Sequence, residues 1–512
     1  MKKILSVLFS RMFIVLVLVL IQLAVLIGTL LLFSNYAVYF YWVCIAVSLV
    51  AVIRIVNNRM EPGYKIAWIV PIMVFPIFGG LLYFMLGGNK MTRRMRKKLN
   101  GMDMKMKQLL SPDFHAEHLA VHGLNAVTQA RYMEQYAFSP VYGNTASEYF
   151  KLGDDVFPAM IKELRAAKAY IFLEFFIIQP GIFWNSVLEV LEEKAAQGVE
   201  VRVMYDDMGC VFCLPRHYDK LLQKKGIRCL AFNRFIPVMS LRHNNRDHRK
   251  LCIIDGHTAF TGGMNLADEY INRKVRFGHW KDSMIGLKGE AVWSMTVMFL
   301  AMWGFNSDGE EAYESYRPRA LPPEATVAGE KEFVQPYMDS PLDHEAVGET
   351  VYLNLITKAK RYIYITTPYL IISNAVQSAL TCVAKTGVDV RIITPHIPDK
   401  KTVFQLTRSH YLPLLEAGVR IFEYTPGFMH AKNFAVDDRY GTVGTINLDY
   451  RSLFLHFENG VFLYHTPSVL DIKRDFLDTQ AKSQEITIEQ CKNRPLPLRA
   501  WIACLRIIEP LL

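Results

Sequence analysis

The chain has 512 residues, of which 51% are hydrophobic, and a formal net charge of +10. This length accommodates a membrane segment and two α/β halves. The eight cysteines form no closely spaced framework, which excludes a disulfide-stabilised secreted domain and indicates a reducing compartment.

Residues 1–100 carry the hydrophobic character of the chain. Three runs without charged residues cover Met12–Phe33, Tyr36–Ile53 and Ile66–Leu86, with 22, 18 and 21 residues. Each run is long enough to be a candidate membrane span. A cleaved signal peptide fits the first run poorly because a second hydrophobic run follows almost at once. We therefore predict an α-helical membrane region at the N-terminus.

The third run is interrupted by Pro71, Pro76, Gly79 and Gly80 and has basic residues on both sides. The positive-inside rule places both flanks in the cytoplasm. Proline and glycine suit a segment that enters and leaves the membrane on one side. We predict two transmembrane helices plus such a re-entrant segment, with three full spans as the alternative. The basic residues that follow predict a cytoplasmic soluble region close to anionic lipid; they are Lys90, Arg93, Arg94, Arg96, Lys97 and Lys98.

After a linker at 101–140, the chain repeats one pattern in two halves, predicted at 141–330 and 331–490. Residues 167–172 resemble 359–364, and residues 198–203 resemble 387–392. Helical periodicity at 157–166 and 185–196 alternates with these apolar runs. Strands alternating with helices predict an α/β fold with a parallel or mixed sheet in each half. Two such α/β/α halves form a pseudo-two-fold dimer within one chain.

Each half contains the same motif, H-x-K-x4-D-x6-G-x2-N. The two copies place their chemically specific residues at identical spacing. In the first copy these are His248, Lys250, Asp255, Gly262 and Asn265, and in the second His430, Lys432, Asp437, Gly444 and Asn447. A single copy is typical of ordinary polar surface, and the aspartates and glycines fit turns. The duplication is what predicts an active site.

The chemistry of these residues points to a phosphodiester held between two half-sites. Alternate side chains of an extended segment share a face, so each histidine and lysine pair points the same way. The two lysines, with Asn265 and Asn447, would donate to the non-bridging oxygens. One imidazole would attack phosphorus while the other transfers protons. A carboxylate should fix the histidine tautomer, and Asp282 and Glu458 follow the two motifs.

The motif resembles that of the phospholipase D superfamily, and the whole chain resembles bacterial cardiolipin synthases of that type. Further matching segments are Pro76–Gly79 with Tyr83, Asp206–Gly209, Thr366–Tyr369 and Asn447–Ser452 leading to Glu458. The resemblance implies transfer of a phosphatidyl group between two phosphatidylglycerol molecules at a bacterial cell membrane. It also implies His248 as the nucleophile and His430 as the acid/base. Residues 181–184 depart from the short acidic turn of many relatives, so the donor pocket stays open.

Several alternatives remain at this level. The net charge permits a nucleic-acid partner, but the clustering of basic residues beside the membrane region favours phosphatidylglycerol and other anionic lipids. The alternative functions are a phospholipase D hydrolase, a synthase that uses phosphatidylethanolamine as donor, and a non-catalytic scaffold. The reaction scheme requires no metal or other cofactor. Residues 491–512 predict an amphipathic helix that lies in the membrane interface or docks on the protein core.

Overall fold

The computed structural model describes residues 24, 27–28, 37–76, 79–86, 93–110, 116–234, 245–307, 311–318, 321, 331–343 and 345–511. The chain forms two compact units. Of the described residues, the smaller unit contains those within 1–91, 234–245 and 506–511, and the larger unit contains those within 92–233 and 246–505.

The smaller unit is built from hydrophobic helices. Helix α3 (Ala37–Asn57) is confirmed where the second hydrophobic run predicted it. It contains the one stretch, Val38–Asn57, that is long and apolar enough to cross a membrane in the described part of the chain. The first run, Met12–Phe33, lies almost wholly outside the described residues.

The third hydrophobic run does not form one continuous helix. It divides into α4 (Pro62–Val74) and α5 (Gly79–Leu86). Ser48 of α3 donates a hydrogen bond to the main-chain oxygen of Pro76 at 2.7 Å. A Cβ atom on Gly80 would lie 2.4 Å from Ser48 Oγ, so this close helix contact requires glycine. The proline and glycine positions therefore mark a break between two helices. That this segment is re-entrant and does not span the membrane stays a prediction.

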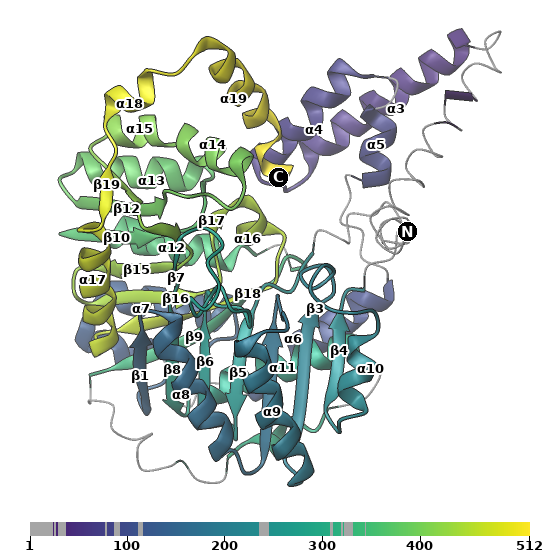
Figure 1. Ribbon diagram of the computed structural model, residues 1–512. Helices are drawn as coiled ribbons and strands as arrows, with labels where there is room; N and C mark the ends of the chain where they lie inside the picture. The colour runs from purple at the N-terminus through teal and green to yellow at the C-terminus, as the bar shows by residue number, and fades with distance from the viewer. Residues whose placement is uncertain are drawn as a thin grey trace. The chain divides into compact units, whose positions relative to one another are not determined.

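The larger unit contains two mixed β-sheets (Figure 1). The two sheets have the same strand order. The first sheet follows the order β4-β3-β2-β5-β6-β8-β1, and the second follows β13-β12-β10-β15-β16-β18-β9, with β19 added at the β13 edge. The strands of the first sheet are β1 (Thr145–Phe150), β2 (Tyr170–Phe175), β3 (Glu200–Asp206), β4 (Arg228–Phe232), β5 (Lys250–Ile254), β6 (Thr258–Gly262) and β8 (Met284–Gly289). Those of the second are β9 (Phe333–Asp339), β10 (Tyr362–Thr366), β12 (Asp389–Pro395), β13 (Arg420–Tyr424), β15 (Asn433–Val436), β16 (Tyr440–Gly444), β18 (Glu458–Tyr464) and β19 (Ser483–Glu485). The sequence repeat is thus a repeat of topology.

Helices cover both faces of each sheet because alternate side chains of a central strand point to opposite faces. In β2, Ile171 and Leu173 join the hydrophobic core with α8 and α9, whereas the ring of Phe172 stacks on Phe299 of α11 at 4.7 Å. In β10, Ile363 and Ile365 join the core with α12 and α13, whereas Tyr364 stacks on Phe476 of α17 at 4.7 Å. Each half is therefore an α/β/α sandwich. The helices are α8 (Gly153–Ala166), α9 (Ile182–Ala196), α11 (Val292–Asn306), α12 (Val347–Lys358), α13 (Asn374–Lys385) and α17 (Pro467–Gln480).

Shorter elements complete the larger unit. Before the first half come α6 (Arg93–Leu109), η2 (Ala116–His122) and α7 (Leu124–Tyr136). Within the halves lie α10 (Tyr218–Gln223), η4 (Tyr313–Tyr316), α14 (Lys401–Ser409), α15 (Tyr411–Glu416), α16 (Tyr450–Phe454) and α18 (Ile488–Lys492). The pair β11 (Leu370–Ile371) and β17 (Leu448–Asp449) lies within the second half.

The C-terminal region forms helix α19 (Leu496–Ile508), followed by η6 (Glu509–Leu511). In α19, Ile502 and Leu505 are buried, whereas Leu496 and Trp501 are 77% and 52% exposed. The predicted helix is confirmed. Its apolar side chains divide between buried and exposed positions, so docking on the protein core and lying in the membrane interface stay alternative predictions.

Candidate active site

The two motif histidines occupy equivalent positions, each just before the strand of its own half. His248 precedes β5, and His430 precedes β15. The N–H of His248 donates to the main-chain oxygen of Phe457 at 2.9 Å, and the N–H of His430 donates to that of Lys281 at 2.7 Å. Each histidine is therefore anchored through its backbone to the opposite half of the chain.

Two short strand pairings produce this exchange between halves. Strand β14 (Gly427–Met429) pairs in parallel with β7 (His279–Lys281), and Asp247 forms a parallel bridge with Phe457. In the first pairing, His430 follows β14 and Asp282 follows β7. In the second, His248 follows Asp247 and Glu458 follows Phe457. The two half-sites are thereby joined into one site.

The carboxylates pair with the histidines crosswise. Glu458, from the second half, lies 2.8 Å from Nδ1 of His248, from the first half. Asp282, from the first half, lies 2.6 Å from Nδ1 of His430, from the second. All four side chains are nine-tenths or more buried. A carboxylate that accepts from Nδ1–H leaves Nε2 unprotonated, which is the form of imidazole that can attack phosphorus or accept a proton.

The two lysines are buried beside the histidines, with Lys250 fully enclosed and Lys432 1% exposed. The ammonium group of Lys250 donates to the main-chain oxygen of His248, and that of Lys432 to the main-chain oxygen of His430. Buried ammonium groups are energetically unfavourable unless an anion binds them. The site is therefore prepared for a negatively charged ligand.

Burial and positive charge set the ionisation of the site. Burial, with Lys250, Lys432, His430 and Lys400 adding to it, holds the pKa of His248 well below its ordinary value. Burial and Lys432 lower the pKa of His430 to about 4, although Asp282 opposes them. Both imidazoles are thus neutral in the empty site at neutral pH.

The lysines show the same desolvation. Burial lowers the pKa of Lys250 to about 7 and that of Lys432 to about 8, against the opposing effect of carboxylates from both halves. A phosphate placed between the lysines would supply the missing negative charge and raise both pKa values.

The two motif asparagines differ in whether a side-chain amide atom is left without a hydrogen-bond partner among the described residues. Asn265 accepts the N–H of Ile177 at 2.9 Å and donates to the hydroxyl of Tyr270 at 2.7 Å. Asn447 donates to Asp449 at 3.2 Å, while its amide oxygen is buried without a hydrogen bond to any described residue. A role for either amide in holding phosphate stays a prediction.

The structure does not bring Asp255 and Asp437 to the site, and this part of the prediction needs correction. Each follows the far end of its strand, with φ of 51° and 55°. The Asp255 carboxylate accepts the N–H groups of Lys168, Ala169 and Tyr170 at 2.7–2.9 Å. Asp437 binds the equivalent N–H groups of residues 360–362. These aspartates hold a turn against the start of β2 or β10.

Several residues that surround the histidines escaped the sequence analysis. Tyr270 and Trp280 lie against His430, with ring centroids 5.5 and 5.4 Å away, and Phe176 and His456 lie 5.1 and 5.5 Å from His248. For Trp280 and His456 a signal exists in the repeat: each stands two residues before the carboxylate that binds the neighbouring histidine.

The approach to His248 is fixed by a buried carboxylate. Asp206, which begins the Asp206–Gly209 segment, accepts the N–H groups of Met208 and Gly209 at 2.9 Å and that of Asp247 at 3.1 Å. Burial raises the pKa of Asp206 to about 7. This segment of the sequence therefore holds the backbone that precedes the histidine.

One group of side chains has the composition of a metal site. Potential ligand atoms of His248, His456 and Glu458 lie within 4.8 Å of one another. The ammonium groups of Lys250 and Lys432 act on the same histidine and oppose a divalent cation there. The charge of the surroundings therefore suits an anion better than a metal.

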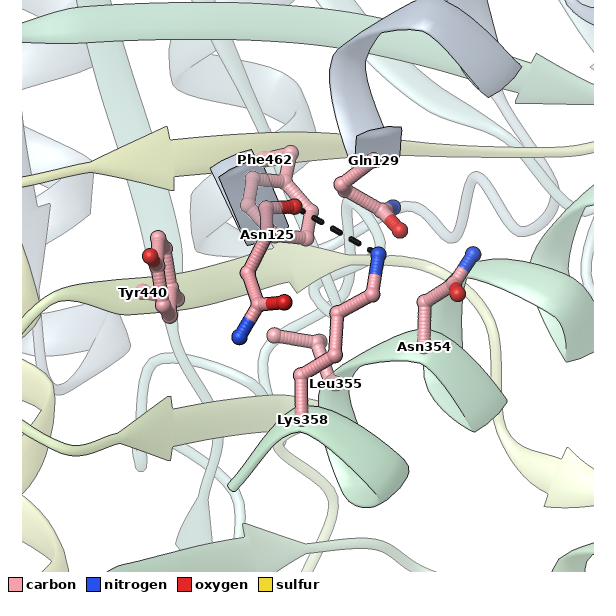
Figure 2. A pocket seen from close by; sticks show the side chains of 7 residues that line it. All are labelled: Asn125, Gln129, Asn354, Leu355, Lys358, Tyr440 and Phe462. Carbon is pink, nitrogen blue, oxygen red and sulfur yellow. Dashed lines mark hydrogen bonds between the residues drawn. The ribbon is translucent and has the colours of Figure 1, made fainter. Parts of the chain in front are cut away.

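A separate pocket lies away from these residues. Figure 2 shows its lining side chains, Asn125, Gln129, Asn354, Leu355, Lys358, Tyr440 and Phe462. Tyr440 begins β16 and pairs with Tyr464 at the end of β18, whereas Glu458 begins β18. The pocket therefore lies toward the end of β18 opposite the catalytic carboxylate and is not part of the active site.

Comparison with known proteins agrees with this site. Residues 160–277 and 352–479 match the family described as cardiolipin synthase, phospholipase D-like domain, and residues 46–88 match the phospholipase D-nuclease N-terminal family. A phosphatidylserine synthase from Haemophilus influenzae Rd KW20 shares the fold with a TM-score of 0.55 and 15% identity, over 72% of this chain and 95% of its own. Fold and site thus define a phospholipase D-like enzyme with two tandem halves.

Similar sequences show to which family of phospholipase D-like enzymes the chain belongs. An uncharacterized protein from Streptococcus mutans is 41% identical over 90% of this chain and 99% of its own length. Cardiolipin synthases from Halalkalibacterium halodurans and Geobacillus kaustophilus are 33% and 34% identical, over 92% and 91% of this chain and 93% and 92% of their own lengths. The chain belongs to the cardiolipin synthase family and is a phosphatidyltransferase.

Proposed function

We propose that this enzyme transfers a phosphatidyl group from one phosphatidylglycerol to another, giving cardiolipin and glycerol. The observation that carries the proposal is the crossed pairing of two buried imidazoles with two carboxylates, beside two buried lysines. Relatives that are named cardiolipin synthases and cover nine-tenths of the chain support the choice of substrate.

The first step is the attack of one unprotonated imidazole nitrogen on phosphorus. A nitrogen–phosphorus bond forms, and the bond from phosphorus to the glycerol oxygen breaks. The other imidazole takes up a proton from solvent when the negative charge of the bound phosphate raises its pKa, and it supplies the proton that glycerol carries away. Lys250 and Lys432 stabilise the charge on the non-bridging oxygens as it develops. This leaves a covalent phosphatidyl-histidine.

The second step reverses the first with a new alcohol. The terminal hydroxyl of a second phosphatidylglycerol gives its proton to the second imidazole and attacks phosphorus. The nitrogen–phosphorus bond breaks and cardiolipin is released. The family resemblance gives His248 as the nucleophile and His430 as the acid/base, and labelled phosphate trapped on one of them would test that order.

The proposal is tested with the full-length protein in phosphatidylglycerol vesicles. We expect cardiolipin and glycerol in equal amounts from the wild type. His248→Ala and His430→Ala should each reduce turnover by more than about a thousandfold, because the two imidazoles act as a unit. Phosphatidic acid in place of cardiolipin would identify a hydrolase, and near-normal turnover by either variant would contradict the two-histidine scheme.

A further inference from the structure

His456 is a third imidazole held beside the catalytic pair. The N–H of Phe457 donates to the main-chain oxygen of Arg246 at 2.8 Å, and the N–H of His248 donates to the main-chain oxygen of Phe457 at 2.9 Å. These two bonds fix the segment that carries His456 against the segment that carries His248. The two imidazole centroids are 5.5 Å apart.

Both ring nitrogens of His456 are buried, and neither has a hydrogen bond to any residue that the structure describes. The Glu458 Oε1 atom is 3.8 Å from His456 Nδ1, which is too long for a hydrogen bond. Buried polar atoms in folded proteins are nearly always paired, with protein or with water or ligand. Burial lowers the pKa of His456 to about 4, although the nearby Glu458 carboxylate opposes this shift, so the neutral ring offers one donor and one acceptor.

The other half of the repeat has an equivalent residue beside its catalytic histidine. Trp280 stands two residues before Asp282, as His456 stands two residues before Glu458. Its ring lies 5.4 Å from that of His430, and its Nε1 is likewise buried without a hydrogen bond to the described residues. Each catalytic histidine therefore has a neighbour with an unused polar group at the equivalent position.

The two neighbours differ in chemistry. The indole of Trp280 can only donate a hydrogen bond, whereas the imidazole of His456 can donate and accept at once. Phosphoryl and ester oxygens only accept, so a donor alone satisfies them. A hydroxyl group both donates and accepts, and it matches His456.

We infer that His456 is a further substrate-contacting residue that hydrogen-bonds a hydroxyl group of the phospholipid headgroup. The inference rests on the proposed function, because the glycerol headgroup of phosphatidylglycerol carries such hydroxyls. A site built to pair with a hydroxyl discriminates against ligands that lack it, since its own polar atoms are then left unpaired. His456 would thus contribute to selection of a hydroxylated headgroup.

The test compares two substrates for the same variants of the full-length enzyme. For His456→Phe we expect kcat/KM on phosphatidylglycerol vesicles to fall at least about tenfold, the effect of about one lost hydrogen bond. Hydrolysis of bis(p-nitrophenyl) phosphate, which carries no hydroxyl, should change less than about threefold. His456→Asn keeps a donor and an acceptor and should recover most of the activity on phosphatidylglycerol.

His122→Phe is the matched control. His122 is a buried imidazole stacked on His465, which follows the far end of β18, roughly 20 Å from Glu458 at about 3.3 Å per residue. It should leave both activities within about twofold of the wild type. Equal losses on both substrates in His456→Phe, or no loss on either, would overturn the inference. A wild type that cleaves bis(p-nitrophenyl) phosphate but not phosphatidylglycerol would instead overturn the proposed function.

Discussion

Lys250 has opposite consequences for binding and for folding. Its ammonium group is fully enclosed, and burial lowers its pKa to about 7. Lys250→Met should reduce turnover by about a hundredfold or more, because it removes charge stabilisation in the transition state. The same change should stabilise the empty enzyme by about 1–3 kcal/mol, because it removes an unfavourable buried charge.

The stability gain should depend on pH with a definite sign. The pKa of Lys250 is lower in the folded than in the unfolded chain, so the unfolded chain binds more protons between about pH 7 and pH 10. Wild-type stability therefore rises through that window, and the advantage of Lys250→Met is largest below about pH 7. Denaturant titration at pH 6 and pH 9 measures the free energy of unfolding of the wild type and of Lys250→Met. The same difference between the two proteins at both pH values would contradict the buried-charge explanation.

The same ionisation predicts the pH dependence of catalysis. The free enzyme needs protonated Lys250 and Lys432 to attract phosphate, and their pKa values are about 7 and about 8. We therefore expect kcat/KM to fall as pH rises above about 7, the lower of the two values, because both lysines must be protonated. Bound phosphate raises both pKa values, so kcat should fall only at higher pH. Initial rates over pH 6–10 with phosphatidylglycerol vesicles test this, and superimposable profiles would count against it.

At the scale of elements, the crossing of strands between halves decides which carboxylate serves which histidine. The β7–β14 pair brings Asp282 to His430, and the Asp247–Phe457 bridge brings Glu458 to His248. Glu458→Gln should therefore slow the attack by His248, and Asp282→Asn should slow both steps, because His430 transfers a proton in each; we expect losses of about a hundred- to ten-thousandfold. Rapid-quench measurement of the proposed phosphatidyl-histidine separates them: Glu458→Gln should slow its formation, whereas Asp282→Asn should slow both its formation and its release. The same kinetic defect in both would contradict the crossed assignment.

The sequence predicted both carboxylates but not that each one pairs with the histidine of the other half. Spacing within a motif reports neighbours along one strand, whereas the β7–β14 pairing joins residues about 150 positions apart. The α/β halves, the break in the third hydrophobic run and the shared face of histidine and lysine followed from periodicity and from proline and glycine positions. The contribution of His456 and Trp280 was not predictable from either half alone, because aromatic residues beside a strand are usually core.

Asp255 shows how an identical spacing can mislead. Strand β5 separates it from His248 by roughly 20 Å at about 3.3 Å per residue. Asp255→Ala removes three hydrogen-bond contacts and places alanine at a positive φ, so it should destabilise the fold by about 2–4 kcal/mol. The specific activity of the folded fraction should be unchanged. A loss of kcat at wild-type stability would return Asp255 to the catalytic residues.

At the scale of the whole molecule, the reaction requires a site that remains at the level of lipid headgroups. Helix α3 carries Arg54 in its last turn, and α6 begins with Arg93 and Arg94, so basic residues flank the hydrophobic α4–α5 segment on both sides. Each such charge near an anionic leaflet contributes about 1 kcal/mol to membrane binding. We propose that both boundaries face the cytoplasm and that the catalytic halves lie against the inner leaflet.

Single cysteines in a variant that lacks the eight native cysteines test this orientation, provided that the variant still makes cardiolipin in cells. Positions Arg59 and Lys97 suit the cytoplasmic test because both side chains are exposed, whereas Lys98 donates to the main-chain oxygen of Ser307 at 2.9 Å. An impermeant thiol reagent added to intact cells should label a cysteine at Asn35 and should not label those at Arg59 and Lys97. Permeabilised cells should label all three, which shows that the shielding comes from the membrane. Labelling at Lys97 but not at Arg59 in intact cells would mean that the α4–α5 segment spans the bilayer and that the catalytic halves lie outside.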